Sequence, residues 1–347
     1  MPENFYILPG TEVTASEMLE GPPDAENQVF SIADQPYALG DRVWGDGNVY
    51  RSLVSNNSAA LSDVASWENE GPVDQGALKW VAGTYATGTY KVHNSKLWQS
   101  AIDGNNTEPS AGSDDWTDRG PTNRFKAFDT FLDDSTEWVT GITFELDIPS
   151  RVTQIVILKP VGAQFKVTVT SASAGMVYQK TFRASRDSGG RWWNYFNAPV
   201  RQVGAITVQD LPPYSDATIR IEIAAAEGLP VGVGQIVLGF GEAKATVTTG
   251  TGVGMESNSV KDTNAFGRPI IVGYPPSKTV SFAIRMPAVK VDDFAETMFE
   301  REAQPTAFFM RDGGPYGAVV YGLFEDFYVD HHTRVRAQCV VTIKGFS

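Results

Sequence analysis

Short runs of alternating apolar and polar residues fill the second half of the chain. In 142–146, 165–170 and 218–223 an apolar side chain occupies every second position, which is the period of a β-strand with one buried face. Turn residues such as glycine and proline separate the runs. Many short strands divided by turns predict a jelly-roll-like β-sandwich over 122–245. Further strands of this sandwich are expected at 152–158, 177–182, 205–208 and 235–240.

The segment 246–347 combines strand patterns with one helical pattern. Phe294 and Met298 stand one helical turn apart, and Pro305 stops the pattern. An α-helix is therefore expected over 291–304, within a C-terminal β-rich domain. Strands are expected around it at 269–272, 279–286, 306–310, 317–324 and 334–344.

A glycine-rich run at 248–254 has the composition of a phosphate-binding loop. It lacks the Gly-Lys-Ser/Thr ending of such loops, and Met255 and Glu256 follow it in place of a basic residue. We therefore expect a strand and a bend at a sheet edge.

A repeat with a period of 48 residues runs through the first third of the chain. Tyr37 and Gly40 recur as Tyr85 and Gly88. A fixed period predicts two copies of one structural unit, which here cover about 37–72 and 85–121. The other matching pairs are Tyr50 with Trp98, Asn57 with Asn105 and, after one inserted residue, Trp67 with Trp116.

Each unit is too small to bury much surface. Domains below about 40 residues usually need a disulfide, a metal or a neighbour for stability, and the units contain no cysteine. Glycines at 45 and 47 indicate a tight hairpin within 42–50, so each unit is predicted to be a small twisted sheet. The N-terminal arm, 1–36, has no core of its own, and its apolar segment 5–9 is expected to supply a strand to the C-terminal domain or to a neighbouring copy.

Aromatic residues crowd both units. Flat rings stack on the apolar face of a sugar while amides and carboxylates bind its hydroxyls, so sugar binding is one interpretation. The alternative is that the rings form a miniature core, which we favour for the three aligned aromatic pairs, whereas Trp44, Trp80 and Tyr90 are expected to face solvent. A glycine-led aromatic loop at 189–195 is a further candidate. The candidate sugar contacts are Trp44, Tyr50, Trp80, Tyr90, Trp98, Arg191, Trp192 and Trp193.

Charge and hydropathy narrow the range of partners. The chain has 41 acidic and 28 basic side chains, and its net charge of −13 disfavours nucleic acid, whose phosphates need clustered Lys and Arg. No segment approaches the roughly 20 consecutive apolar residues of a membrane span, and the first residues lack the basic and apolar regions of a signal peptide. Neither membrane insertion nor export is expected.

The chain offers little of the chemistry that catalysis or metal binding needs. His331 and His332 are adjacent, so on a strand they point to opposite faces and cannot share a metal ion. Acidic pairs at 114–115 and 133–134 lie beside turn residues, and a glycosidase pair among them stays open on sequence grounds. Cys339 lies in an alternating run and is expected to be a buried strand residue. We expect no catalytic residues, metal or cofactor; should calcium bind, the candidates are Asp129, Asp133 and Asp134.

Two resemblances connect these patterns to known families. A tyrosine, a glycine, a short hairpin and a distal tryptophan, seen at 37–72 and again at 85–121, resemble small chitin- and cellulose-binding modules. That resemblance implies three-stranded carbohydrate-binding modules whose contacts lie on exposed aromatics. The segment 121–129, followed by Trp138, resembles galactose-binding-like β-sandwiches. By that resemblance Asn123, Arg124 and Asp129 are structural residues of the first loop, and a local ion pair between Arg124 and Asp129 is the simplest expectation.

The segments 120–124 and 261–267 also resemble tail proteins of long-tailed bacteriophages. This resemblance implies a virion structural protein of the tail tip or baseplate, made in the host cytoplasm and assembled as a homo-oligomer, either a ring or a trimer. Its partners would be other tail proteins and a host-surface glycan, which many copies bind with high avidity. Two alternatives stay open: a purely architectural ring component, or the binding portion of a polysaccharide-degrading enzyme.

Overall fold

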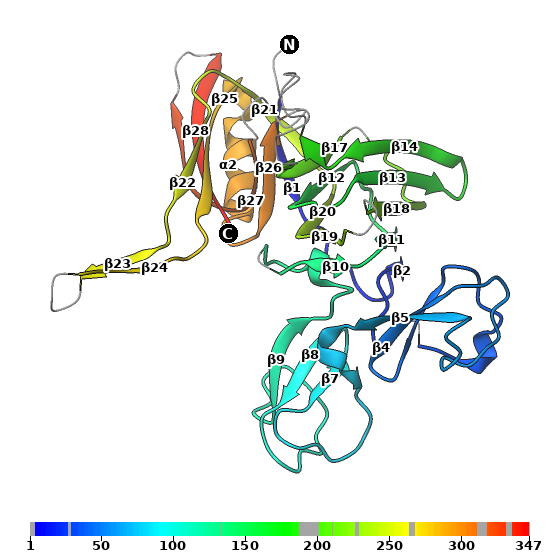
Figure 1. The fold of residues 1–347 in the computed structure, drawn as a ribbon. Coiled ribbons are helices and arrows are strands. Elements are labelled where there is room, and N and C mark those ends of the chain that lie inside the picture. The colour runs from blue at the N-terminus through cyan, green and yellow to red at the C-terminus, as the bar shows by residue number, and fades with distance from the viewer. Residues whose placement is uncertain are drawn as a thin grey trace, which may run out of the picture.

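The computed structural model describes residues 4–26, 29–132, 134–186, 201–209, 211–225, 229–263, 268–310, 318–330 and 335–346. The chain is mainly β, as the alternating pattern predicts. Figure 1 shows a large sheet with α2 packed against it, a second group of strands beside it, and two small sheets at the far end. Within the described residues no helix is both long and apolar enough to cross a membrane.

The large sheet closes on itself. Its strand β21 pairs with both β1 and β25, so that six of its seven strands form a ring, and β22 extends the sheet beyond β25. We call this part the barrel. In spatial order its strands are β21 (Glu242–Val247), β1 (Asn4–Pro9), β26 (Thr306–Met310), β27 (Val319–Asp330), β28 (Arg336–Gly345), β25 (Ser277–Pro287) and β22 (Gly252–Glu256).

The first strand of the chain lies between strands from its far end. In β1, Phe5 pairs with Ala245 on one side and with Met310 on the other, which confirms that the N-terminal segment supplies a strand to the C-terminal domain. Phe5 and Ile7 point into the barrel core, whereas Tyr6 and Leu8 pack against the neighbouring sandwich. Both faces of β1 are buried, which explains why its sequence is continuously apolar.

The predicted helix is present and shorter than expected. A 3₁₀ turn η4 (Ala288–Lys290) leads into α2 (Val291–Glu300), and residues 301–304 form turns instead of helix. Val291, Phe294 and Met298 face the barrel core, as the helical spacing predicts. Two other sequence predictions are confirmed here, because Cys339 is buried on β28 and the glycine-rich run turns into the edge strand β22.

The sandwich has two main sheets that face each other across a shared core. Strands β11, β13 and β18 bury alternate residues, because one face meets the core and the other meets solvent. Every residue of β12 and β20 is buried, because these strands also pack against the barrel. One sheet contains β14 (Gly175–Arg183), β13 (Gln164–Ser171), β18 (Ala217–Ala224), β11 (Gly141–Asp147) and β2 (Met18–Glu20); the other contains β17 (Ala205–Val208), β12 (Gln154–Leu158) and β20 (Gln235–Gly239).

Two small sheets correspond to the sequence repeat. We call them module A and module B. Module A contains β3 (Arg42–Gly45), β4 (Asn48–Ser52) and β5 (Trp67–Pro72); module B contains β6 (Leu78–Lys79), β7 (Tyr90–His93), β8 (Lys96–Ser100) and β9 (Trp116–Pro121). The remaining short elements are η1 (Ile32–Asp34), η2 (Asp74–Gly76), η3 (Lys126–Phe128), β10 (Thr136–Trp138), β19 (Val231–Val233), β15 (Ser185–Arg186), β16 (Arg201–Gln202), β23 (Val260–Thr263) and β24 (Pro269–Val272).

Candidate functional site

An asparagine organises each module in the same way. In module A, Nδ2 of Asn57 donates to Oγ of Ser52 at 3.0 Å and to the carbonyl of Ser66 at 2.8 Å. In module B, Nδ2 of Asn105 donates to Oγ of Ser100 at 3.1 Å and to the carbonyl of Asp115 at 2.9 Å. The matching bonds explain why these asparagines recur, since each one joins the long loop of its module to the central strand.

The aligned aromatic residues form the interior of the modules. Nε1 of Trp67 donates to the carbonyl of Ala59, and the edge of its ring meets Tyr37 at a centroid distance of 5.4 Å. Trp116 makes the equivalent bond to Thr107 and meets Tyr85 at 5.9 Å. The prediction that the aligned rings form a miniature core is therefore confirmed for these two pairs, although Tyr85 is only half-buried.

The expectation that Trp44 faces solvent is wrong. Its side chain is only 3% exposed and belongs to one apolar cluster with Val49 of the same module and with Val92 and Leu97 of module B. That cluster also contains the core of the sandwich, whereas module A keeps a separate small cluster around Trp67. The repeat pattern carries no information on this cluster, because the cluster combines residues of both copies with the sandwich core.

The other candidate sugar contacts differ in how accessible they are. Trp98 is buried and its Nε1 donates to the carbonyl of His93, whereas Tyr50, Trp80 and Tyr90 are half-buried and keep part of their surface free. Three further candidate sugar contacts, Arg191, Trp192 and Trp193, lie outside the described residues. The same is true of the calcium candidate Asp133 and of the adjacent histidines His331 and His332.

Arg124 connects residues 18–22 of the N-terminal arm to the sandwich through hydrogen bonds. The buried guanidinium donates to the carbonyls of Gly21, Pro22 and Met18. These contacts support a structural role for Arg124, but they replace the expected ion pair with Asp129. Sequence reasoning considered only local partners, whereas the actual partners are about a hundred residues away.

Glu70 joins module A to the sandwich. Its side chain is 2% exposed, and its carboxylate pairs with Nε of Arg42 at 2.8 Å and with Nε of Arg51 at 3.3 Å. From the sandwich, Nε1 of Trp138 donates to the same carboxylate at 3.0 Å, and the hydroxyl of Thr140 donates at 3.3 Å. A buried carboxylate is tolerated because these donors compensate its charge.

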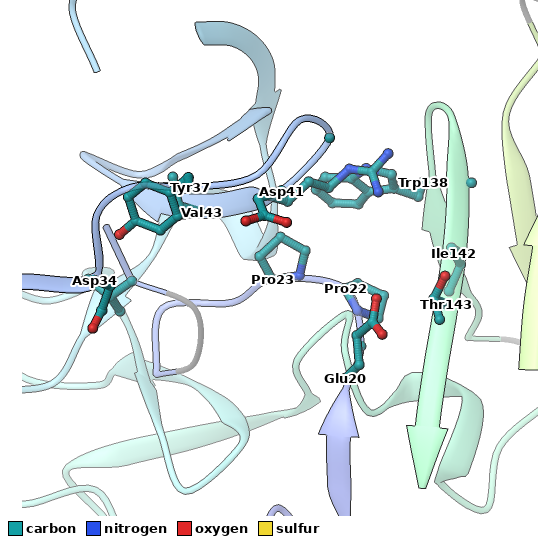
Figure 2. Close-up of a pocket in the computed structure, with 15 residues that line it drawn as sticks. Glu20, Pro22, Pro23, Asp34, Tyr37, Asp41, Val43, Trp138, Ile142 and Thr143 are labelled. Atoms are coloured by element: carbon teal, nitrogen blue, oxygen red, sulfur yellow. The ribbon is translucent and has the colours of Figure 1, made fainter. Parts of the chain in front are cut away.

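A cavity of about 430 Å³ lies beside this contact, where module A meets the linker and the sandwich. Figure 2 shows Tyr37, Asp41 and Trp138 on one side of it and Pro22, Pro23 and Glu20 on the other. Acidic side chains prevail in its lining, and the basic residue Arg42 is engaged by Glu70. Carboxylates beside aromatic rings in a concave surface can bind ligand hydroxyls or amines.

Module B carries a cavity of similar size, about 430 Å³, at its own contact with the sandwich. Tyr90, one of the candidate sugar contacts, lines it together with Arg119 and Asp74. Burial raises the pKa of Asp74 to about 6, even though Oδ1 accepts a hydrogen bond of 2.8 Å from the backbone N–H of Asn123. Among the described residues, no group of three or more His, Cys, Asp or Glu side chains is placed to hold a metal ion.

Comparisons with known proteins give fragmentary similarity. No family model matches the chain, and no curated protein resembles it in sequence. One similar solved structure is chitosan-binding module 1 of a chitosanase/glucanase from Paenibacillus sp. IK-5, with 8% identity, 33% of this chain and 81% of that chain covered, and a TM-score of 0.23. Another belongs to the tail of an empty GTA particle, with 16% identity, coverage of 31% and 87%, and a TM-score of 0.23. Similarity at this level assigns neither a family nor a function.

Proposed function

We propose that this protein is a non-enzymatic structural component of a phage virion, in the tail tip or baseplate, which assembles through its β domains and displays two modules for host-surface glycans. The observation that carries the proposal is a projecting apolar hairpin on the barrel. The duplicated modules, each with a cavity at its base, support the glycan-binding part.

The hairpin of β23 and β24 projects beyond the barrel as a continuation of β22 and β25 (Figure 1). Ile271 is 66% exposed, and Val260, Ile270 and Val272 are exposed as well. A two-stranded hairpin is marginally stable alone in water, and contiguous exposed apolar residues mark an interaction surface. The hairpin is therefore suited to packing against another chain.

A second copy of the chain is the partner that we propose for the hairpin. On the barrel, Tyr328 of β27 and Val340 of β28 are cross-strand partners, and both are exposed. One chain thus carries an apolar projection and a separate apolar face. A contact between two different surfaces of identical chains is head-to-tail, and repetition of it closes into a ring when the rotation allows.

Replacing Ile271 by Asp is expected to convert the oligomer into monomers, because a charge placed in the buried contact has no partner. Light scattering after size-exclusion chromatography, with negative-stain images, measures the result. Val64→Asp is the control, since Val64 is also an exposed β-branched apolar residue but lies in module A, away from the barrel. A wild-type protein that is monomeric at every concentration tested would contradict assembly through this hairpin.

Replacing Tyr90 by Ala is expected to weaken binding of the assembled protein to host cells or a glycan array by more than about tenfold, because avidity multiplies the loss at each copy. Binding to immobilised bacterial polysaccharide by the full-length chain measures it. Leu39→Ala, an exposed apolar residue of module A, is the control.

The architectural alternative also has support, because Trp44 and Trp98 are buried and not available to a sugar. An assembled ring that binds no glycan at millimolar concentration would favour that alternative over the glycan-binding part of the proposal.

A further inference from the structure

A cavity of about 710 Å³ lies where module B, the sandwich and the barrel meet. Module B contributes Lys96 and Asp118, the sandwich contributes Phe131 and Gln235, and the barrel contributes Arg301. Cavities of this size at domain junctions commonly hold small ligands. It shares no lining residue with the cavity beside module A and only Pro121 with the cavity of module B, and Tyr90 does not line it.

Gln235 of β20 lines this cavity and has an acceptor with no hydrogen-bond partner. Its side chain is 3% exposed, and its amide nitrogen donates to the backbone carbonyl of Asp129. Turning the amide over would place two acceptors against each other, so the orientation is determined by that carbonyl. Oε1 therefore lies on the other side, where it is buried without a hydrogen-bond partner. A ligand that donates a hydrogen bond to Oε1 would remove the free-energy cost of this unpaired buried acceptor.

A donor and an aromatic ring complement this acceptor. Nη1 of Arg301 donates to Oε1 of Gln304 at 2.7 Å, whereas its Nε is buried and has no partner. Phe131 is 64% exposed and lines the cavity, and a hydrogen bond of 2.8 Å from its backbone N–H to Oδ1 of Asp129 holds its loop in place. The lining thus combines an acceptor, a donor and a flat apolar surface.

The charges of the lining largely cancel. Asp118 pairs with Lys96 at 2.7 Å, and the remaining charged residues are Glu12, Asp129 and Arg301. Tyr321 also lines the cavity and adds no charge near neutral pH, since burial, with a smaller contribution from Asp129, raises its pKa further, to about 12. No sign of charge prevails, in contrast to the acidic cavity beside module A, so the site favours an uncharged ligand.

We propose that this junction cavity binds a neutral saccharide. A sugar hydroxyl both donates and accepts, so once a small shift of the surrounding side chains uncovers Gln235 Oε1 and Arg301 Nε, neighbouring hydroxyls can satisfy both atoms. The C–H face of the sugar ring then packs on Phe131. The inference rests on the proposed glycan attachment and adds a binding site at the junction of module B with the sandwich and the barrel. Bound sugar would contact all three parts of the chain at once.

Titration of the full-length protein with neutral saccharides tests the proposal. The probes are galactose and the N-acetylglucosamine trisaccharide, compared with the cationic glucosamine trisaccharide and the anionic trigalacturonate, by calorimetry or ligand-observed NMR. Phe131→Ala and Gln235→Leu should each weaken binding of the neutral probe about tenfold, through loss of the packing surface and of the acceptor respectively.

Two matched variants control for effects on folding. Phe240→Ala removes another exposed phenylalanine, and Gln154→Leu removes another buried glutamine whose Oε1 has no partner; neither residue lines the cavity. Both controls should bind the neutral probe as the wild type does. Melting temperatures show whether Gln235→Leu is folded. If that variant does not fold, Phe131→Ala still tests the site.

Three outcomes would overturn the proposal. Neutral saccharide binding that survives both cavity variants and is lost on Tyr90→Ala would place the sugar on module B and leave the proposed function intact. Tighter binding of a charged probe would exclude a neutral ligand class. Wild-type protein that binds bacterial cells but none of the neutral probes would also defeat the cavity site, whereas failure to bind either would defeat the glycan-binding function as well.

Discussion

Glu70→Gln is expected to lower the free energy of unfolding by about 3 kcal/mol and to loosen module A from the sandwich. The buried carboxylate of Glu70 is paired with Arg42 and Arg51 and accepts hydrogen bonds from Trp138 and Thr140. The substitution keeps the shape of the side chain but leaves the two guanidinium groups without their buried anion. Loss of one partner of a buried ion pair costs far more than loss of a surface pair.

Urea unfolding and limited proteolysis of the linker before module A measure the two effects. Glu68→Gln is the control, because Glu68 also pairs with Arg51 but its side chain is 47% exposed. That control should lose at most about 1 kcal/mol. Equal losses in the two variants would show that the buried network does not hold module A in place.

Asp74→Asn is expected to stabilise the protein by up to about 3 kcal/mol near pH 7.5. The pKa of Asp74 rises from 3.8 to about 6 on folding, chiefly through burial, with a further increase from Asp24. The folded state therefore binds the proton more tightly than the unfolded state, and the ionised carboxylate destabilises the fold above pH 6. Asparagine is neutral at every pH and keeps an acceptor for the N–H of Asn123.

The stabilisation should shrink as the pH falls. The wild type gains stability as the pH decreases through 6 toward 3.8, so the advantage of Asp74→Asn should decrease to about 1 kcal/mol near pH 4.5. Urea unfolding at both pH values measures this trend. Asp46→Asn is the matched control: Asp46 has a φ of 50°, close to the 51° of Asp74, but it is exposed in a turn. A gain that does not change with pH would contradict burial of a charged carboxylate at residue 74.

Local sequence patterns predicted most of the secondary structure, and long-range contacts account for what they missed. Alternation predicted β11, β13 and β18 because each has one buried face, and the repeat predicted that Asn57 and Asn105 are equivalent. Periodicity could not reveal that Trp44 is buried, because the apolar cluster that contains it draws residues from the other copy and from the sandwich. The candidate sites also depend on contacts between residues that are far apart in the sequence.

The residues that shape the candidate sites carry little local signal. Glu70 is one acid among many in an acidic third of the chain, and its partners at Trp138 and Thr140 are about seventy residues away. Gln235 lies in a continuous apolar run, where a polar residue between buried neighbours is the one sequence feature that could have drawn notice. Its unpartnered oxygen and the cavity beside it depend on three segments that only the fold brings together.

The position of β1 has a consequence for synthesis. Its partners β21 and β26 lie some 240 and 300 residues further along the chain, so the ribosome completes both modules and the sandwich before the barrel can form. Contacts of such long sequence separation form slowly. Until then the nascent protein retains an unpaired N-terminal strand, and polypeptides that terminate before β26 cannot close the barrel.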